Sequence, residues 1–288
     1  MRCETSPSVN MQQSGVVRDL ERQGDMATYT YIRVAYSFER KIATVTLQRP
    51  EVHNAMNAQV IEELIRAFLE LSSDERLHAV VLTGDGPSFS AGGDVNAMRG
   101  AANFTKEQNV NDALHLADLL HIINTLPCPV VARVNGTAMG GGVGLVAVCD
   151  IAIAAESARF AFSEVKLGIA PAVISPYVLR KIGESHARLL FVTGERFSAA
   201  RAHEIGLVHS VAAQEQLDEV VQKVLKELLT SAPQAIRACK ALALNVPQME
   251  REEARIYTAQ TLAHLRVGDE GQEGLQAFLE KRKPHWMA

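Results

Sequence analysis

The sequence has few cysteines, and those it has are not arranged as a metal site or a disulfide framework. The four stand at positions 3, 128, 149 and 239, with no Cys-x-x-Cys pair and no histidine cluster at ligand spacing. A structural zinc site is therefore not expected, and we predict no metal. Scarce cysteine fits a reducing compartment, so we predict a cytoplasmic protein.

Excess basic charge, long apolar runs and abundant aromatic residues are also missing. The chain has 29 basic against 33 acidic residues, which argues against a general nucleic-acid binder because phosphate neutralisation needs Lys and Arg. Polar residues interrupt every apolar stretch before 18 residues, so no membrane span is expected. Aromatics make up 5% and hydrophobic residues 47%, a balance that favours helices packed on a sheet over an aromatic-rich sandwich.

The first 27 residues differ from the rest of the chain. They are polar, carry both charge signs and show no sustained periodicity. An apolar signal core is missing, and their acidic residues are unusual for a mitochondrial transit peptide. We predict a flexible extension over residues 1–27, with a short helix near Val16–Arg22 and alternative starts at Met11 and Met26 considered.

Apolar periodicity then predicts strands that alternate with helices. Strands are predicted over residues 29–36, 42–47, 78–83, 130–134 and 149–155, the first two forming a hairpin. Helices are predicted over residues 58–71 and 105–124, and nearly all of the chain after Pro176 is predicted helical, with breaks at Gly194, Gly206 and Pro233. This pattern indicates an α/β protein with a core over residues 28–212 and a helical region over residues 213–288, either a second small domain or a covering layer.

Two glycine-rich turns follow predicted strands, at residues 89–94 and 136–144. A dinucleotide loop is disfavoured because Phe89 stands where the third glycine of that motif belongs, and a nucleotide-triphosphate loop is disfavoured because Gly142-Val143 replaces its Lys-Ser/Thr. Close helix–strand packing is one explanation of the glycines. The other is an oxyanion hole, in which one N–H from each turn faces the same carbonyl oxygen and stabilises negative charge.

Three segments carry a resemblance to a known family. FSAGGDVNAM, NGTAMGGGVGLVAVCDIAIA and FAFSEVKLGIAPA resemble the signature segments of the enoyl-CoA hydratase/isomerase (crotonase) family, and the similarity runs over roughly residues 29–285. The resemblance implies a spiral of ββα units with a C-terminal helical trimerisation region. It also implies trimers or hexamers that bind acyl-CoA thioesters, with coenzyme A as part of the substrate and no separate cofactor.

The resemblance also assigns roles to particular residues. The oxyanion donors would be the N–H groups of Gly93, where alanine is more usual, and Gly141, and the acid/base would be Glu164. Further substrate-binding positions would be Ala91, Gly92, Asp94, Met139, Gly140, Gly144, Pro171 and Ala172. Coenzyme A would be contacted by His53, Ala55, Phe278 and Lys281, although Asn96 replaces a lysine that often contributes there.

Glu164 has a plainer explanation, a surface carboxylate paired with Lys166. Family hydratases use two glutamates, and the first would fall at position 144, where this chain has glycine. A single glutamate is compatible with a hydratase, with an enoyl-CoA isomerase, or with a silent binding protein of the same fold. The segment after Pro171 (Ala172–Pro176) is interpreted as an apolar wall beside the acyl chain or as core packing, and Asp94 and Asp150 as anchors of helices.

The substrate is predicted from the amino-acid sequences of three segments. GGGVGLVAVCDIAIA, SEVKLGIAPAVISPYV and the EGQEGLQAFLEKRKPHW ending resemble bacterial 3-methylglutaconyl-CoA and isohexenylglutaconyl-CoA hydratases of leucine and acyclic terpene breakdown. Both substrates are branched at Cβ and carry a second carboxylate, which could partly replace the missing glutamate. We predict a hydratase for such a branched enoyl-CoA.

Overall fold

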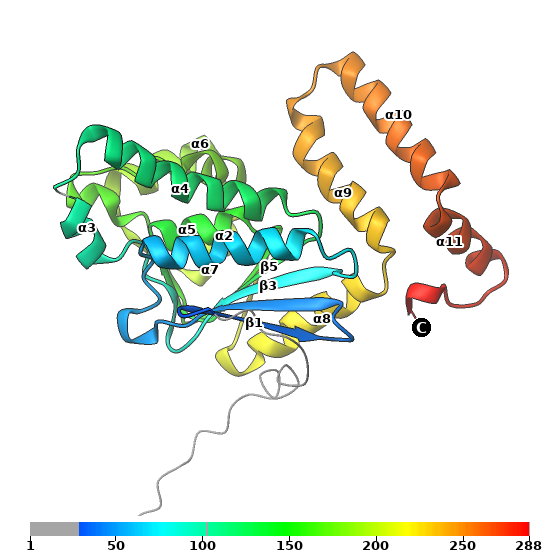
Figure 1. The fold of residues 1–288 in the computed structure, drawn as a ribbon, viewed down its shortest axis with the longest axis horizontal. Helices are drawn as coiled ribbons and strands as arrows, with labels where there is room; N and C mark the ends of the chain where they lie inside the picture. Colours follow the sequence, from blue (N-terminus) through cyan, green and yellow to red (C-terminus); the bar gives the residue numbers. More distant parts are fainter. Residues whose placement is uncertain (1–28, 102, 288) are drawn as a thin grey trace, which may run out of the picture.

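Two β-sheets form the frame of the protein in the computed structural model, which describes residues 29–101 and 103–287 (Figure 1). The larger sheet has the order β1-β2-β3-β5-β7-β10 and the smaller the order β4-β6-β8-β9. In the larger sheet β1 and β2 are antiparallel and all other neighbours are parallel. The strands are β1 (Ile32–Ser37), β2 (Ile42–Leu47), β3 (Ala79–Gly84), β4 (Ser88–Ser90), β5 (Val130–Val134), β6 (Thr137–Met139), β7 (Ile151–Ala155), β8 (Arg159–Ala161), β9 (Arg196–Ser198) and β10 (Ser210–Ala212).

Helices cover both faces of the larger sheet. The α2 and α4 helices lie side by side above it, and α8 crosses below it (Figure 1). The helices are α2 (Ala58–Ser72), α3 (Val95–Ala101), α4 (Lys106–Thr125), α5 (Gly141–Val148), α6 (Ser175–Thr193), α7 (Ala199–Glu204), α8 (Leu217–Leu229), α9 (Pro233–Asn245), α10 (Arg251–Val267) and α11 (Asp269–Leu279). The predicted α/β class with C-terminal helices is confirmed.

The larger sheet separates two apolar clusters. Alternate residues of its strands face opposite sides, so that Val45 and Leu47 pack toward α2 while Ile42 packs toward α8. The α8 helix contributes buried leucines and valines with helical spacing, at Leu217, Val221 and Leu225. Both faces of the sheet are therefore covered where α8 crosses it, as a parallel sheet requires.

Most predicted elements are present with small shifts at their ends. The helix predicted over residues 58–71 is α2, capped by Asn57, whose side-chain oxygen accepts a hydrogen bond from Val60 N at 2.9 Å. The strand predicted over residues 149–155 begins only at Ile151, because Cys149 still caps the end of α5. The predicted extension over residues 1–27, including its possible helix at Val16–Arg22, lies outside the described residues.

The prediction of an almost wholly helical chain after Pro176 was wrong at two places. The β9 strand pairs with β8 and so extends the smaller sheet, and β10 pairs with β7 at the edge of the larger one. Each strand has only three residues, which is too short for alternating hydrophobicity to be recognised. The chain therefore returns twice to the sheets before the C-terminal helices begin.

The last three helices, α9 to α11, extend away from the sheets (Figure 1). One buried ion pair ties α9 to the core, since Lys240 Nζ lies 2.7 Å from Asp150 Oδ2, and the same carboxylate oxygen accepts from Val130 N at 2.7 Å. None of the α10 residues is buried. The division between residues 212 and 213 stays a prediction. The α8 helix, which lies on the C-terminal side of this division, packs on the larger sheet. None of the helices among the described residues is long and apolar enough to cross a membrane.

Candidate active site

The two glycine-rich turns lie next to each other at the carboxyl ends of two neighbouring strands of the smaller sheet. The first (Ala91–Asp94) follows β4 and the second (Gly140–Gly144) follows β6, and these strands are parallel neighbours. Gly92 and Gly140 both have positive φ, +86° and +48°. A Cβ atom at Gly92 would lie 2.6 Å from Met139 O and 3.2 Å from Gly141 N, so the two turns are in van der Waals contact. Both positions need glycine.

Two backbone N–H groups remain free at this junction. Met56 forms a β-bridge opposite Gly93, and both of its hydrogen bonds are made with the two residues that flank Gly93. Met56 N donates to Gly92 O at 2.7 Å, and Asp94 N donates to Met56 O at 2.9 Å. The Gly93 N–H therefore points away from Met56. Gly141 is the first residue of α5, where an N–H has no partner within the helix. Among the described residues, neither N–H has a backbone acceptor.

Other glycines in the same turns serve close packing. A Cβ atom at Gly142 would lie 2.3 Å from Ser90 O, and one at Gly136 would lie 2.0 Å from Pro87 O. These glycines let α5 and β6 approach the backbone around β4. The packing explanation offered for the glycine clusters therefore applies to Gly136 and Gly142, whereas the free N–H groups belong to Gly93 and Gly141.

Glu164 lies against the second turn. It sits in a single 3₁₀ turn (Ser163–Leu167) that follows β8, and β8 is held beside the turn because Gly140 N donates to Ala161 O at 2.9 Å. A Cβ atom at Gly140 would lie 2.9 Å from Glu164 Oε1, so a side chain there would displace the carboxylate. The strand order β4-β6-β8 thus brings both turns and this glutamate together.

The Glu164 carboxyl group is half-buried and incompletely paired. Its Oε2 atom is buried without a hydrogen-bond partner, and burial raises the pKa of the group above that of an ordinary glutamate. The described residues include no ion pair to Lys166, which is exposed, so the surface-pair explanation is not supported. A carboxylate held without a partner beside two free N–H groups has the arrangement of an acid/base next to an oxyanion hole.

Position 144 is not an empty space left by a missing glutamate. A Cβ atom there would lie 2.3 Å from Ile174 Cγ2 and 3.1 Å from Ile174 Cβ, with Leu120 Cδ2 at 3.8 Å. Ile174 is 2% exposed and immediately precedes α6. The segment after Pro171 therefore contributes one side chain that fills the position beside Gly144, which the sequence interpretation as an apolar wall did not specify.

We predict that a glutamate at position 144 is tolerated only when Ile174 is shortened. Gly144→Glu alone is expected to destabilise the protein by about 2–3 kcal/mol, because the longer side chain overpacks this buried site. The double variant with Ile174→Ala is expected to recover at least half of that loss. Thermal unfolding of both single variants and the double variant gives the coupling between the two positions. If Gly144→Glu melts at the wild-type temperature, Ile174 does not limit this position.

Arg49 supports the first turn and was missed as a functional residue. Its guanidinium lies 2.9 Å from Asp94 Oδ2 and donates to Ala55 O at 2.6 Å. Asp94 in turn accepts from Asn96 N at 2.9 Å at the start of α3, and its pKa is lowered by hydrogen bonds to Arg49 and to backbone N–H groups, although burial opposes this. The sequence predicts no individual role for Arg49. This ion pair fixes the segment that presents Gly93 N.

The four residues predicted to contact coenzyme A fall into two groups. His53 and Ala55 lie beside the first turn, where His53 Nδ1 is 3.0 Å from Ser88 Oγ. Phe278 and Lys281 lie at the end of α11, and Phe278 is 81% exposed. In Figure 1, α11 lies beyond α9 and α10, on the opposite side of the view from α3 and α5. A single chain therefore does not bring Phe278 and Lys281 to Glu164. The described residues contain no cluster of three side chains that could hold a metal ion.

Comparison with known proteins gives a consistent result. The family model described as enoyl-CoA hydratase/isomerase matches residues 37–288. A Thermus thermophilus relative, provisionally named an enoyl-CoA hydratase, is 36% identical over 245 residues, covering 85% of this chain and 97% of the relative.

Solved structures have the same fold. A Legionella pneumophila chain, provisionally named an enoyl-CoA hydratase/isomerase (crotonase), is 44% identical with a TM-score of 0.82, covering 88% of this chain and 98% of that chain. An enoyl-CoA hydratase from Shewanella pealeana is 36% identical with a TM-score of 0.85, covering 96% of this chain and all (100%) of that chain.

Proposed function

Since this chain belongs to the enoyl-CoA hydratase/isomerase family, we propose that it is a lyase that adds water across the α,β double bond of a branched enoyl-CoA thioester. The observation that carries the proposal is the convergence of the Gly93 and Gly141 N–H groups with the unpartnered carboxylate of Glu164. Two free backbone N–H groups from adjacent turns can stabilise an oxyanion, and a desolvated carboxylate with a raised pKa is a suitable acid/base.

The reaction follows from these three groups. The thioester oxygen accepts hydrogen bonds from Gly93 N and Gly141 N, which draw electrons away from the double bond. Glu164 takes a proton from water as the water oxygen bonds to Cβ, and the electron pair of the double bond moves to the thioester oxygen as an enolate. The proton then passes from Glu164 to Cα, the carbonyl re-forms, and the carboxylate is regenerated.

Coenzyme A enters as part of the substrate, and no separate cofactor is required by this chemistry. His53 and Ala55 contact it beside the first turn of the same chain. Phe278 and Lys281, far from Glu164 in one chain, reach the coenzyme A of a neighbouring subunit in a trimer or hexamer. The exposed apolar side chains on the last two helices support an assembled state, among them Ile256, Leu262, Val267, Leu275, Phe278 and Leu279.

Gly144 and Ile174 support a branched substrate with its own carboxylate, of the 3-methylglutaconyl-CoA type. With no carboxylate at position 144, water is held on one side by Glu164 alone. A second carboxylate on the substrate supplies the missing acceptor for water. Substrates of this kind arise in leucine and terpene breakdown, which we propose as the metabolic setting in the cytoplasm.

One comparative assay tests the substrate. Purified enzyme is given 3-methylglutaconyl-CoA, isohexenylglutaconyl-CoA and crotonyl-CoA, and hydration is followed by loss of the conjugated thioester absorbance. We expect kcat/KM for one of the two branched substrates to exceed that for crotonyl-CoA by about 10²-fold, because crotonyl-CoA leaves one water hydrogen bond unmade. Equal efficiency on crotonyl-CoA would contradict the branched specificity but not the hydratase activity.

The single carboxylate also favours a second candidate, double-bond isomerisation. In that reaction Glu164 removes a proton from one carbon of the enoyl chain and returns it to another, and no water is added. Reaction in H₂¹⁸O distinguishes the two functions. Product labelled at Cβ supports the hydratase, whereas a shifted, unlabelled double bond supports the isomerase. A protein that catalyses neither reaction would be a binding protein of the same fold.

A further inference from the structure

A row of polar side chains crosses the larger sheet on the face opposite α2. Backbone pairing places Arg33 of β1 beside Thr46 of β2, Thr46 beside Thr83 of β3, and Thr83 beside Arg133 of β5. Neighbouring strands are about 4.8 Å apart, so two hydroxyl groups lie between two guanidinium groups along one line. The far face is otherwise apolar where α8 covers it. The polar row therefore lies at the border of that cluster.

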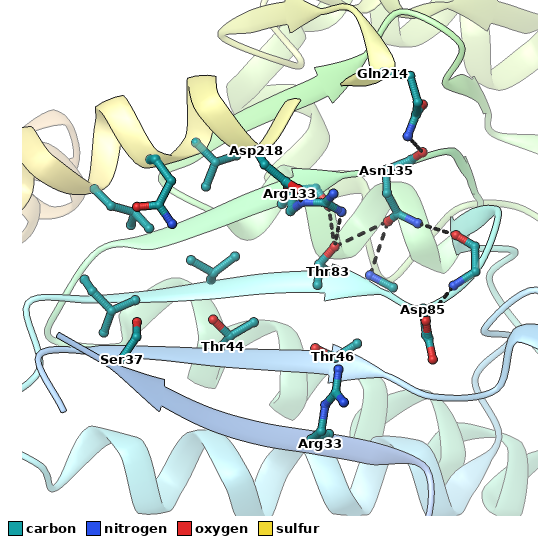
Figure 2. A pocket seen from close by; sticks show the side chains of 17 residues that line it. Arg33, Ser37, Thr44, Thr46, Thr83, Asp85, Arg133, Asn135, Gln214 and Asp218 are labelled. Atoms are coloured by element: carbon teal, nitrogen blue, oxygen red, sulfur yellow. Dashed lines mark hydrogen bonds and ion pairs between the residues drawn. The ribbon is translucent and has the colours of Figure 1, made fainter. Parts of the chain in front are cut away.

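A cavity of about 230 Å³ opens over this row (Figure 2). Its floor is formed by β1, β2 and β3, and α8 forms a second wall through Asp218, Val221 and Leu225. Figure 2 shows Arg33 reaching from β1 to a position beside Thr46. The volume corresponds to about eight water molecules at roughly 30 Å³ each. It suits a small organic molecule.

The polar groups of the cavity divide into satisfied and free ones. Thr83 Oγ1 donates to Arg133 O at 2.9 Å, and Asn135 Nδ2 donates to Gly86 O at 2.9 Å. Thr44 and Thr46 are only 7% and 6% exposed, yet their hydroxyl groups have no partner among the described residues. Neither hydroxyl is among the buried side-chain atoms that lack a partner, so both face the open space of the cavity, where water or a ligand can hydrogen-bond to them.

The charges divide in the same way. Arg133 Nε lies 2.6 Å from Asp218 Oδ1, so this cation is neutralised within the protein. Asp85 also lines the cavity, and its Oδ1 accepts from the N–H of the next residue, Gly86, at 2.9 Å, but none of the described residues forms an ion pair with it. Within the part of the chain that the structure describes, Arg33 forms no ion pair. The cavity thus has one unpaired cation, Arg33, next to two hydroxyl groups that face its open space, and one unpaired carboxylate, Asp85.

We propose that this cavity binds a small monocarboxylic acid with a short apolar tail. The carboxylate would pair with the Arg33 guanidinium and accept a hydrogen bond from the Thr46 hydroxyl, since guanidinium matches the two oxygens of a carboxylate. The tail would contact the apolar side chains that also line the cavity, Ile42, Val81, Val221 and Leu225. The site is on the other face of the larger sheet from α2 and does not depend on the proposed hydratase reaction.

The probe is 3-methylbutanoate, and its neutral analogue 3-methylbutanamide is the matched control. Methyl NMR spectra of the full chain labelled at Ile, Leu and Val report on Val81, Val221 and Leu225, which line the cavity, and on Ile174, which does not. We expect saturable shifts of the first three methyl groups over the millimolar range with the acid and none with the amide. Glu164→Gln is expected to leave this binding unchanged.

Variants identify the residues responsible. Arg33→Met is expected to weaken binding about 10-fold or more, and Thr46→Val, which keeps the volume, by about 3-fold. Arg188→Met, which removes an exposed guanidinium elsewhere, is expected to have no effect. The proposal is overturned if the cavity methyl groups do not shift, if acid and amide bind equally, or if Arg33→Met binds as tightly as the wild type. It is also overturned if the acid shifts only Ile174, which would place it in the Glu164 site, or if the probe fails to bind because a second copy covers this face.

Discussion

Replacing Glu164 by glutamine is expected to lower kcat by about 10³-fold, within the range for loss of a general acid/base. The substitution keeps the shape of the side chain but removes the group that, in the proposed mechanism, takes a proton from water and returns it to Cα. KM is expected to change by less than about 3-fold, because glycine backbone and not Glu164 holds the thioester oxygen. Turnover within a factor of three of the wild type would refute the assignment of Glu164.

The same variant has a predicted pH dependence. Burial raises the pKa of Glu164, so the active carboxylate forms at a higher pH than an ordinary glutamate would require. The rate of the wild type should therefore rise with pH along a limb above the usual carboxyl range. The residual rate of Glu164→Gln should lack this limb, and initial rates measured across the acidic and neutral range compare the two.

Stability is expected to change in the opposite sense to activity. A carboxyl group whose pKa is raised in the folded state binds its proton more tightly there than in the unfolded state. Its stabilising contribution to the free energy of unfolding is therefore complete below the pKa of the unfolded state and is lost as pH rises through the pKa of the folded state. Glu164→Gln stays neutral and avoids this loss. Its melting temperature should exceed that of the wild type by about 2 °C above the raised pKa, a small value because the group is partly exposed. The two proteins should melt together at lower pH.

The sequence was sufficient to predict the parts of the site that depend on local pattern. Consecutive glycines after strands are costly unless backbone must approach something closely, and Gly92 and Gly140 do so with positive φ. Glu164 was identified through the resemblance of its segment to a family motif. The structure adds that burial raises the pKa of its carboxyl group.

Other features depend on residues that are distant in the sequence. Ile174 follows Gly144 by thirty residues, and only packing of the segment before α6 against α5 shows that it occupies the place of a missing side chain. Arg49 forms an ion pair with Asp94, which lies 45 residues further along the sequence. The polar row on the far face joins four strands, and no local periodicity reports which residues become neighbours across strands. These features required tertiary structure.

Adjacent glycines of the first turn are expected to respond very differently to alanine. Gly92→Ala should lower kcat/KM by about 10²-fold or more, the effect of displacing one oxyanion donor. Gly92 has φ of +86°, and its Cβ would lie 2.6 Å from Met139 O, a backbone atom of the second turn. Neither the strained conformation nor the collision can be relieved without moving the segment that presents Gly93 N.

Gly93→Ala is the matched variant, and its kcat/KM should stay within about 5-fold of the wild type. Its Cβ would meet Met98 Cε at 2.4 Å, but this is the end of a flexible side chain that is 39% exposed and can rotate away. The backbone N–H stays in place, because both hydrogen bonds of the Met56 bridge involve the residues on either side. Steady-state kinetics and thermal unfolding of both variants test the difference. Equal losses of activity in two folded variants would show that the turn tolerates no side chain for reasons other than the position of the Gly93 N–H.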